Sequence, residues 1–186
     1  MTFVSRAGEK LAHGLSVFSL DVHDFVCADF GCSTGGFTDC LLQNGAAKVY
    51  AVDTGYGVLD WKLRNDPRVI VMERTNAMHV ELPEKVDFIT IDASWTRLEK
   101  LAENASRNLK PAGRIVALLK PHYEAAPSLL RKGKLPPEHI DSVIAGVGEA
   151  LKNLGLETIG QTVSPITGKK GDNVEILLNL LPKTIE

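Results

Sequence analysis

The chain has 186 residues, of which 44% are hydrophobic and 24% are charged, with a formal net charge of −2. These values fit one globular domain over residues 1–186, and they exclude disordered, collagen-like and repeat-array classes. No apolar run approaches the ~20 residues of a membrane span, so we expect no membrane partner. Three cysteines without metal-type spacing predict reduced thiols, a cytoplasmic protein and no metal site.

Strand-like apolar runs alternate with helical patterns along the chain. In chain order the predicted elements are a helix (7–18), a strand (25–30), a helix (36–43), strands (48–52, 69–72 and 86–91), a helix (99–108), a turn (110–113), a strand (114–119), a helix (137–154) and two strands (156–163 and 174–181). This alternation predicts an α/β, Rossmann-like fold, with a mostly parallel seven-stranded sheet and helices on both faces. Only a loop joins the last two strands, which predicts that they pair antiparallel.

A glycine-rich turn follows the first predicted strand, in the stretch DFGCSTGGF that begins at Asp29. Such a turn lets a ligand approach the backbone beside a helix N-terminus. Asp53 ends the next strand, where an acid accepts hydrogen bonds from ribose hydroxyls. Dinucleotide sites favour GxGxxG, but Ser33 stands where the middle glycine would be. The loop therefore favours S-adenosylmethionine, with Asp29 facing its ammonium group. A glycine turn without a ligand is the alternative. The expected cofactor residues from this stretch and the next strand are Asp29, Gly31, Ser33, Thr34, Gly35, Gly36 and Asp53.

Four ionisable residues stand at positions that an open α/β sheet uses for ligands. Asp92 and Lys120 follow apolar strands, Glu175 lies early in the last strand, and Lys10 lies in the first helix. Each has a plain alternative: a helix cap for Asp92, a solvated turn for Lys120, and surface positions for the other two. Together they suit methyl transfer to a sugar hydroxyl, which needs a base.

A lysine acts as a base only when it is neutral, and a free lysine has a pKa of about 10.4. A second cation nearby and partial burial lower such a pKa, whereas an arginine does not lose its proton. Two lysines with two carboxylates therefore predict a general base held in place by its neighbours.

The chain resembles the hemolysin-A-like (TlyA-type) ribosomal RNA methyltransferases, within the FtsJ-type 2'-O-methyltransferases. The resemblance runs from about Val4 to Leu180. The stretches that carry it are VSRAGEKL, GCSTGGFTDCLLQNGAAKVYAVDTGYG, WKLRNDPRV, ERTNAM, DFITIDAS, LLKPHYE and SPITGKKGDNVE.

The resemblance implies a class I S-adenosylmethionine-dependent methyltransferase fold and a Lys-Asp-Lys-Glu catalytic tetrad, which falls on Lys10, Asp92, Lys120 and Glu175. It makes Lys120 the general base on a ribose 2'-hydroxyl. It also implies cofactor contacts from Asn76, facing the adenine edge, and from Asp92, besides those of the loop. The implied partner is RNA, in the form of ribosomal RNA or a ribosomal subunit.

Typical members of the family begin with a small RNA-binding domain, and this chain starts at the segment that normally follows it. We therefore expect a second copy of the chain or another protein to supply RNA docking. Within the chain, the basic loops Arg131–Lys134 and Lys169–Lys170 are candidate phosphate contacts, or simply solvated loops. The aromatic residues Tyr56, Trp61 and Tyr123 are candidates to stack on a base, or to be partly packed.

Two other functions remain open from the sequence. The same fold could methylate a small molecule or a protein. Alternatively, the chain could be a non-catalytic RNA-binding or ribosome-binding protein that keeps the cofactor pocket.

Overall fold

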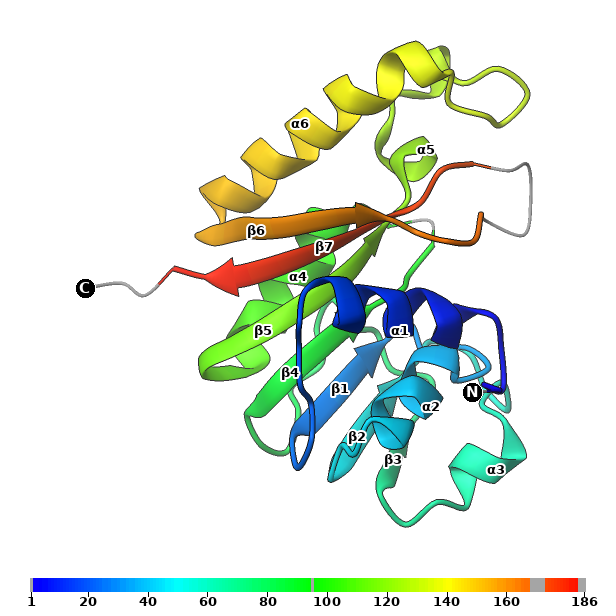
Figure 1. Ribbon diagram of the computed structural model, residues 1–186, viewed down its shortest axis with the longest axis vertical. Coiled ribbons are helices and arrows are strands. Elements are labelled where there is room, and N and C mark those ends of the chain that lie inside the picture. The colour runs from blue at the N-terminus through cyan, green and yellow to red at the C-terminus, as the bar shows by residue number, and fades with distance from the viewer. Residues whose placement is uncertain (1, 95, 168–172, 184–186) are drawn as a thin grey trace.

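The computed structural model describes residues 2–94, 96–167 and 173–183 (Figure 1). The helices are α1 (Ala7–Val17), α2 (Gly36–Gln43), α3 (Trp61–Arg64), α4 (Leu98–Asn108), α5 (Pro121–Glu124), the 3-10 helix η1 (Pro127–Leu129) and α6 (Pro137–Asn153). The strands are β1 (Val26–Phe30), β2 (Lys48–Val52), β3 (Val69–Met72), β4 (Val86–Ile91), β5 (Leu109–Leu119), β6 (Leu156–Val163) and β7 (Ile176–Pro182).

The strands form one seven-stranded sheet in the order β3-β2-β1-β4-β5-β7-β6. The first five strands of this order pair parallel, whereas β7 pairs antiparallel with both β5 and β6. The predicted α/β fold, its mostly parallel sheet and its antiparallel final pair are therefore confirmed. The antiparallel arrangement follows from the loop between β6 and β7, because a parallel pair needs a longer crossover.

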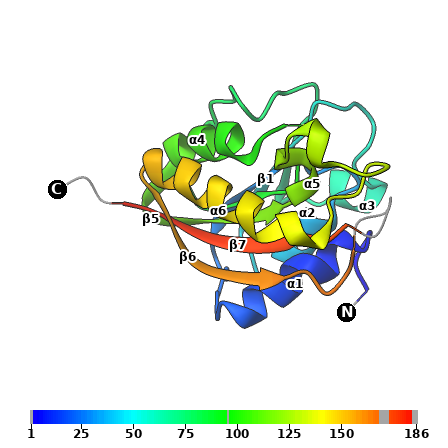
Figure 2. The same ribbon diagram turned by 90° about the horizontal axis from the view of Figure 1, so that it is seen from above.

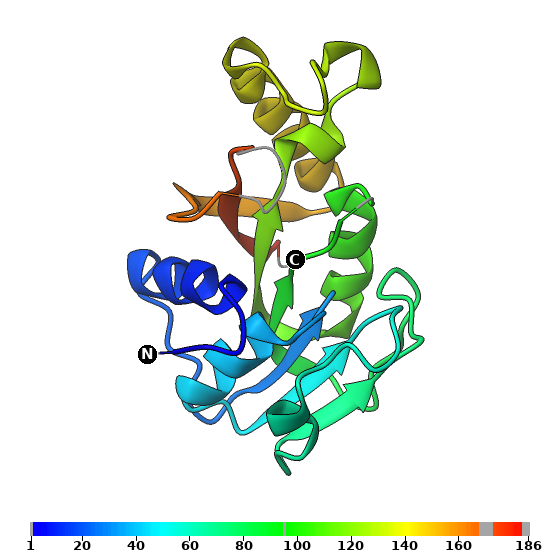
Figure 3. The same ribbon diagram turned by 90° about the vertical axis from the view of Figure 1, so that its right-hand side faces the viewer.

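Helices cover both faces of the sheet. The helices α1 and α2 lie on one face and α4 and α6 on the other (Figures 2 and 3). Side chains of β5 alternate between these layers, as the pleat of a strand requires. Val116 and Leu118 pack in the cluster of α1 and α2, whereas Ile115, Ala117 and Leu119 pack in the cluster of α4 and α6. Both clusters are buried, so the sheet lies in the middle of the core.

The turn predicted over residues 110–113 is wrong, because these residues belong to β5. Val86 pairs with Leu109 and Phe88 pairs with Arg114, so the four residues between form a bulge opposite Asp87. Ala112 has a φ of +63° there. The local sequence is typical of a turn, but the bulge lets β5 continue its pairing with β4. The short helices α3, α5 and η1 were not predicted, since three or four residues carry no periodic pattern.

Asp29 has a different position from the one expected. Its side chain is completely buried in β1. One carboxyl oxygen accepts hydrogen bonds from the backbone N–H of Thr38, at 3.0 Å, and from its hydroxyl, at 2.7 Å; the other accepts from the Thr90 hydroxyl at 3.0 Å. The residue thus links β1 to α2 and β4, in place of the predicted contact with a cofactor ammonium group.

The helices α1 and α2 approach each other closely at Gly36. A Cβ atom built there would lie 2.3 Å from the Ser5 hydroxyl oxygen, 2.8 Å from Ala7 Cβ and 2.9 Å from the backbone nitrogen of Gly8. Two of these neighbours belong to α1, so a side chain at Gly36 would push the helices apart. This contact fixes α1, and Lys10 with it, beside the glycine-rich loop.

We predict that Gly36→Ala destabilises the protein by about 1–3 kcal/mol, because the added methyl group overpacks the α1–α2 contact. The matched control is Gly146→Ala in α6, where a Cβ atom would meet nothing within 4 Å. That change should stabilise by up to about 1 kcal/mol, since alanine favours the helix. Urea unfolding of both variants measures this, and equal stability changes would contradict the account.

We also predict a pH dependence from Asp29, since burial raises the pKa of its carboxyl group from 3.8 to about 7. The folded state then binds this proton more tightly than the unfolded state. Its stabilising effect is complete below pH 3.8 and is lost as the pH rises to about 7. Compared with Asp29→Asn, which has no such proton, the wild type should lose up to ~1.4 kcal/mol of unfolding free energy per pH unit across this window. Parallel stability curves for the two proteins would show that Asp29 does not titrate in this way.

Candidate functional site

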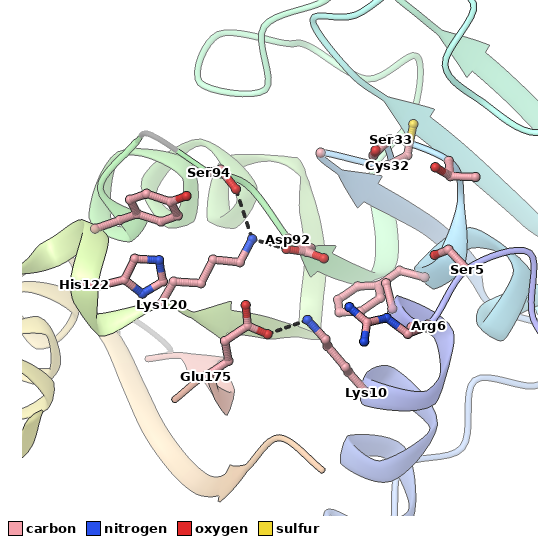
Figure 4. A pocket seen from close by; sticks show the side chains of 15 residues that line it. Ser5, Arg6, Lys10, Cys32, Ser33, Asp92, Ser94, Lys120, His122 and Glu175 are labelled. Carbon is pink, nitrogen blue, oxygen red and sulfur yellow. Dashed lines mark hydrogen bonds and ion pairs between the residues drawn. The ribbon is translucent and has the colours of Figure 1, made fainter. Parts of the chain in front are cut away.

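A cavity of about 360 Å³ lies at the carboxyl ends of the central strands (Figure 4). Side chains from α1, from the glycine-rich loop after β1 and from the segments after β4 and β5 line it, together with one that precedes β7. An open α/β sheet binds its ligands at this edge. The four residues expected to form a tetrad, Lys10, Asp92, Lys120 and Glu175, all line this cavity.

The first ion pair in the cavity joins the segments after β4 and β5. Lys120 Nζ donates to Asp92 Oδ1 at 2.5 Å. The same ammonium group lies 3.2 Å from the Ser94 hydroxyl oxygen and 3.5 Å from the carbonyl oxygen of Ala93. The side chain of Lys120 is 12% exposed and that of Asp92 is 18% exposed. Lys120 is therefore not the solvated turn residue that was the alternative.

The second ion pair joins α1 to the start of the last strand. Lys10 Nζ donates to Glu175 Oε2, and both side chains are buried. The backbone carbonyl of Glu175 accepts from Ser164 N at 2.9 Å, which closes the β6–β7 pair at this end. Neither residue is a surface charge, so the plain alternatives for both are excluded.

The two ion pairs face one another across the cavity, with the heads of Lys10 and Lys120 turned toward its centre (Figure 4). Asp92 is not the cap of a helix, since α4 begins only at Leu98. Two cations and two anions thus share one partly enclosed space. Each lysine has a carboxylate partner, so the charges are compensated where they are removed from water.

His122 also lines this cavity, although the sequence gave no reason to place it in the tetrad. Burial lowers the pKa of its imidazole; Glu175 acts in the opposite direction, and Lys120 adds to the lowering. The imidazole is therefore neutral at pH 7. Its Nδ1 is buried and has no hydrogen-bond partner among the described residues, and its ring lies 4.2 Å from that of Tyr123. The only signal in the sequence was its place two residues after Lys120.

A second cavity of about 280 Å³ adjoins the first at the ends of β1, β2 and β4. Asp53 and Asn76, two of the predicted cofactor residues, line it. Asp53 Oδ2 accepts from Ser33 N at 2.8 Å, and its Oδ1 accepts from Gly55 N at 2.7 Å. Asn76 Oδ1 accepts from Met78 N at 2.9 Å. Both side chains are thus held in fixed orientations.

The glycine-rich loop borders both cavities and needs glycine at two positions. Gly31 has a φ of +87°, and a Cβ atom there would lie 2.6 Å from the backbone oxygen of Asp92. Gly35 has a φ of +100°, and its Cβ atom would lie 2.3 Å from Leu63 Cδ1. Only glycine adopts this backbone without strain in so little space. Ser33 takes a positive φ of 48° as well.

Only some of the loop residues that were predicted to bind a cofactor line the cavities. Gly31 and Ser33 line both cavities, and Thr34 lines the first. Gly35 and Gly36 instead let α2 pack closely against Leu63 and against α1. These two glycines therefore allow the close packing that holds the loop in place.

The two cavities fit an elongated ligand such as S-adenosylmethionine. They share Gly31, Ser33, Asp92 and Ser94 in their lining, so they adjoin. The second cavity offers the acid that a ribose requires, and the first offers polar groups beside the two lysines. Their volumes together fall in the range of small-molecule sites.

The described residues contain no group of three or more His, Cys, Asp and Glu side chains that could hold a metal ion. Burial raises the pKa of the Cys32 thiol in the loop, so this residue is a packed thiol. Within the described part of the chain, every helix is too short or too polar to cross a membrane.

Comparisons with known proteins agree with this geometry. The sequence model of the family described as FtsJ-like methyltransferase matches residues 3–179. The chain is 42% identical over 193 residues to a 16S/23S rRNA (cytidine-2'-O)-methyltransferase, TlyA, of Mycobacterium tuberculosis; the match covers 98% of this chain and 69% of that protein. It is 37% identical over 188 residues to Hemolysin A of Brachyspira hyodysenteriae, with 96% of this chain and 77% of that protein covered.

Solved structures show the same relation. A hemolysin candidate from Streptococcus thermophilus superposes with a TM-score of 0.94 at 38% identity, over 98% of this chain and 68% of that one. An N-methyltransferase, NodS, of Bradyrhizobium japonicum has a TM-score of 0.63 at 16% identity, over 97% of each chain, which shows the shared fold alone.

The chain spans from 66% to 77% of the length of the curated relatives it matches. The family match covers nearly the whole chain, and the fold is that of the class I S-adenosylmethionine-dependent methyltransferases. The chain therefore belongs to the FtsJ-like methyltransferase family.

Proposed function

We propose that this protein transfers a methyl group from S-adenosylmethionine to a ribose 2'-hydroxyl of RNA, with ribosomal RNA as the substrate. The observation that carries the proposal is the pairing of Lys120 with Asp92 and of Lys10 with Glu175 on one cavity. That cavity adjoins a second one with Asp53 in its wall. A base beside a cofactor site is what methylation of a hydroxyl requires.

The cofactor would lie across the two cavities. Asp53 would accept hydrogen bonds from the ribose hydroxyls, and Asn76 would meet the adenine edge. The amino-acid part would extend past Gly31 and Ser33 into the first cavity, beside Thr34 and Asp92. When bound, S-adenosylmethionine supplies an electrophilic methyl group on a sulfonium centre.

Lys120 acts as the general base in this proposal. Its neutral amine would take the proton of the 2'-hydroxyl as that oxygen accepts the methyl group, which the bound S-adenosylmethionine would supply while keeping the electron pair of the broken carbon–sulfur bond. Asp92 orients the amine and stabilises the ammonium group that forms. Lys10 brings a second positive charge to the same cavity, and Glu175 holds Lys10 in place.

The choice of RNA rests on the family and on features of the surface. Relatives that are 42% identical to this chain over 190 and 193 aligned residues are named as ribosomal RNA methyltransferases. Near the glycine-rich loop, Trp61 is 75% exposed and Tyr56 is 71% exposed, with the Arg74 guanidinium 4.3 Å from the Tyr56 ring centre. These rings are not packed in the core, and exposed aromatic side chains suit stacking on unpaired bases.

The basic loops add less to this choice. The side chain of Arg131 is 77% exposed, and its guanidinium lies 3.7 Å from Glu138. This exposure is what supports the proposed phosphate contacts of Arg131–Lys134. Lys169–Lys170 lies outside the described residues. A ribosomal substrate implies work in the cytoplasm, where ribosomes are assembled.

We predict that Lys120→Ala lowers methyl transfer to ribosomal RNA at least ~100-fold, because general-base catalysis contributes that much. Binding of S-adenosylmethionine should stay within about 3-fold of the wild type, since Lys120 is not assigned to the cofactor. The matched control is Lys110→Ala at the other end of β5, where Lys110 Nζ pairs with Asp87 at 2.9 Å. This variant should remain fully active.

The assay uses tritiated S-adenosylmethionine with ribosomal subunits or naked ribosomal RNA, followed by alkaline hydrolysis. Label in alkali-resistant dinucleotides identifies 2'-O-methylation. Label in mononucleotides would instead show that the methyl group is on a base. If the wild type binds the cofactor but labels no RNA, the substrate is a different molecule or the protein is a non-catalytic binder. A fully active Lys120→Ala variant would remove the role given to this lysine.

We further predict that Asp53→Asn weakens binding of S-adenosylmethionine about 10-fold, because the neutral amide replaces a charged acceptor of hydrogen bonds. The amide keeps one acceptor oxygen for the two backbone N–H groups of Ser33 and Gly55, so one hydrogen bond is lost and the melting temperature should also fall. Isothermal titration calorimetry measures this affinity, with Asp21→Asn as the control on an exposed loop far from the cavities. Unchanged affinity in Asp53→Asn would mean that the ribose lies elsewhere.

A further inference from the structure

The ammonium group of Lys120 has three hydrogen-bond acceptors within reach. Asp92 Oδ1 lies at 2.5 Å, the Ser94 hydroxyl oxygen at 3.2 Å and the carbonyl oxygen of Ala93 at 3.5 Å (Figure 4). A lysine ammonium group has three N–H donors. The number of donors thus equals the number of acceptors, so each N–H group of this side chain has a partner in the resting protein.

These three acceptors differ in what they can do when the lysine loses a proton. A carboxylate and a carbonyl group only accept hydrogen bonds, whereas a hydroxyl group both accepts and donates and is free to rotate. A neutral amine keeps two N–H donors and gains a lone pair. Asp92 and Ala93 can hold the two donors. Ser94 is the one of the three whose hydroxyl group can rotate so that it no longer accepts a hydrogen bond from the amine.

The location of Ser94 matches such a role. Its side chain points toward Lys120 from the segment after β4, and it is exposed to the cavity (Figure 4). Ser94 also lines both cavities, so it stands where they meet. The substrate hydroxyl that accepts the methyl group must reach this same junction if it is to meet both the base and the methyl donor.

We infer that Ser94 is a positioning residue for Lys120. In the resting protein its hydroxyl oxygen accepts the third N–H of the ammonium group and aims the side chain at the junction of the cavities. Before the reaction the ammonium group gives one proton to solvent water; the hydroxyl then turns away, and the lone pair of the neutral amine points to the place where the substrate oxygen arrives. This inference rests on the proposed function, in which Lys120 receives the substrate proton.

The test compares Ser94→Ala with Ser94→Thr, which restores the hydroxyl group. We expect Ser94→Ala to lower kcat about 10-fold, because the amine of Lys120 is then less well aimed at the substrate oxygen. The KM for RNA and the affinity for S-adenosylmethionine should change less than about 2-fold, since the residue acts on the base. Ser94→Thr should recover most of kcat. A Ser94→Ala variant as fast as the wild type, or a threonine variant as slow as the alanine one, overturns the inference.

A second measurement does not depend on RNA. Trace labelling with acetic anhydride, read by mass spectrometry, reports the neutral and accessible fraction of each lysine. Removal of one hydrogen-bond partner from the Lys120 side chain should raise its labelling several-fold in Ser94→Ala and leave it unchanged in Ser94→Thr, because an amine held by fewer partners is more accessible to the reagent. Lys110, paired with Asp87 on the same strand, is the internal control.

Equal labelling of Lys120 in the wild type and Ser94→Ala overturns the inference even if RNA is methylated. If the wild type labels no RNA, the proposed function fails, and the acetylation ratio still decides whether Ser94 holds Lys120.

Discussion

The candidate site depends on one electrostatic constraint: two lysines stay in a partly enclosed cavity only because each is paired with a carboxylate. Removal of charged groups from water is costly, and a buried charge that loses its partner is strongly destabilising. Lys10 has Glu175 and Lys120 has Asp92, so neither cation is uncompensated. The same pairs hold the amine heads at the place where, in the proposed function, a proton leaves the substrate. The arrangement that compensates the buried charges is thus also the one that the proposed methyl transfer requires.

The sheet topology makes these pairs possible. Asp92 and Lys120 follow β4 and β5, which are parallel neighbours, so both lie at the carboxyl edge. Glu175 precedes β7, and it reaches the same edge only because β7 runs antiparallel to β5. Lys10 comes from α1, which Gly36 allows to lie directly on α2. One reversed strand and one glycine therefore bring distant parts of the sequence to a common cavity.

Much of this could be predicted from the sequence, and the rest could not, for physical reasons. The strands follow a clear apolar pattern, so their ends, and with them Asp92, Lys120 and Asp53, were correctly placed. The sequence grouped two lysines with two carboxylates, and the family resemblance implied a tetrad, but which lysine pairs with which carboxylate could not be predicted, because spacing along the chain does not encode contacts between α1 and the start of β7. Asp29 was misplaced, since the pattern gives no indication that two threonines on α2 and β4 would take its oxygens. Ser94 and His122 carry no periodic signal, and only the folded backbone shows that they face Lys120.

The most direct test of the account is a double-mutant cycle on the two carboxylates, measured by single-turnover methyl transfer to ribosomal RNA with protein in excess. Asp92→Asn, Glu175→Gln and the double variant would be compared with the wild type. If the ion pairs form one catalytic unit, each single change should remove most of the rate, and the double change should cost far less than the product of the two. Losses that multiply would mean that the two pairs act independently, and the account would be wrong.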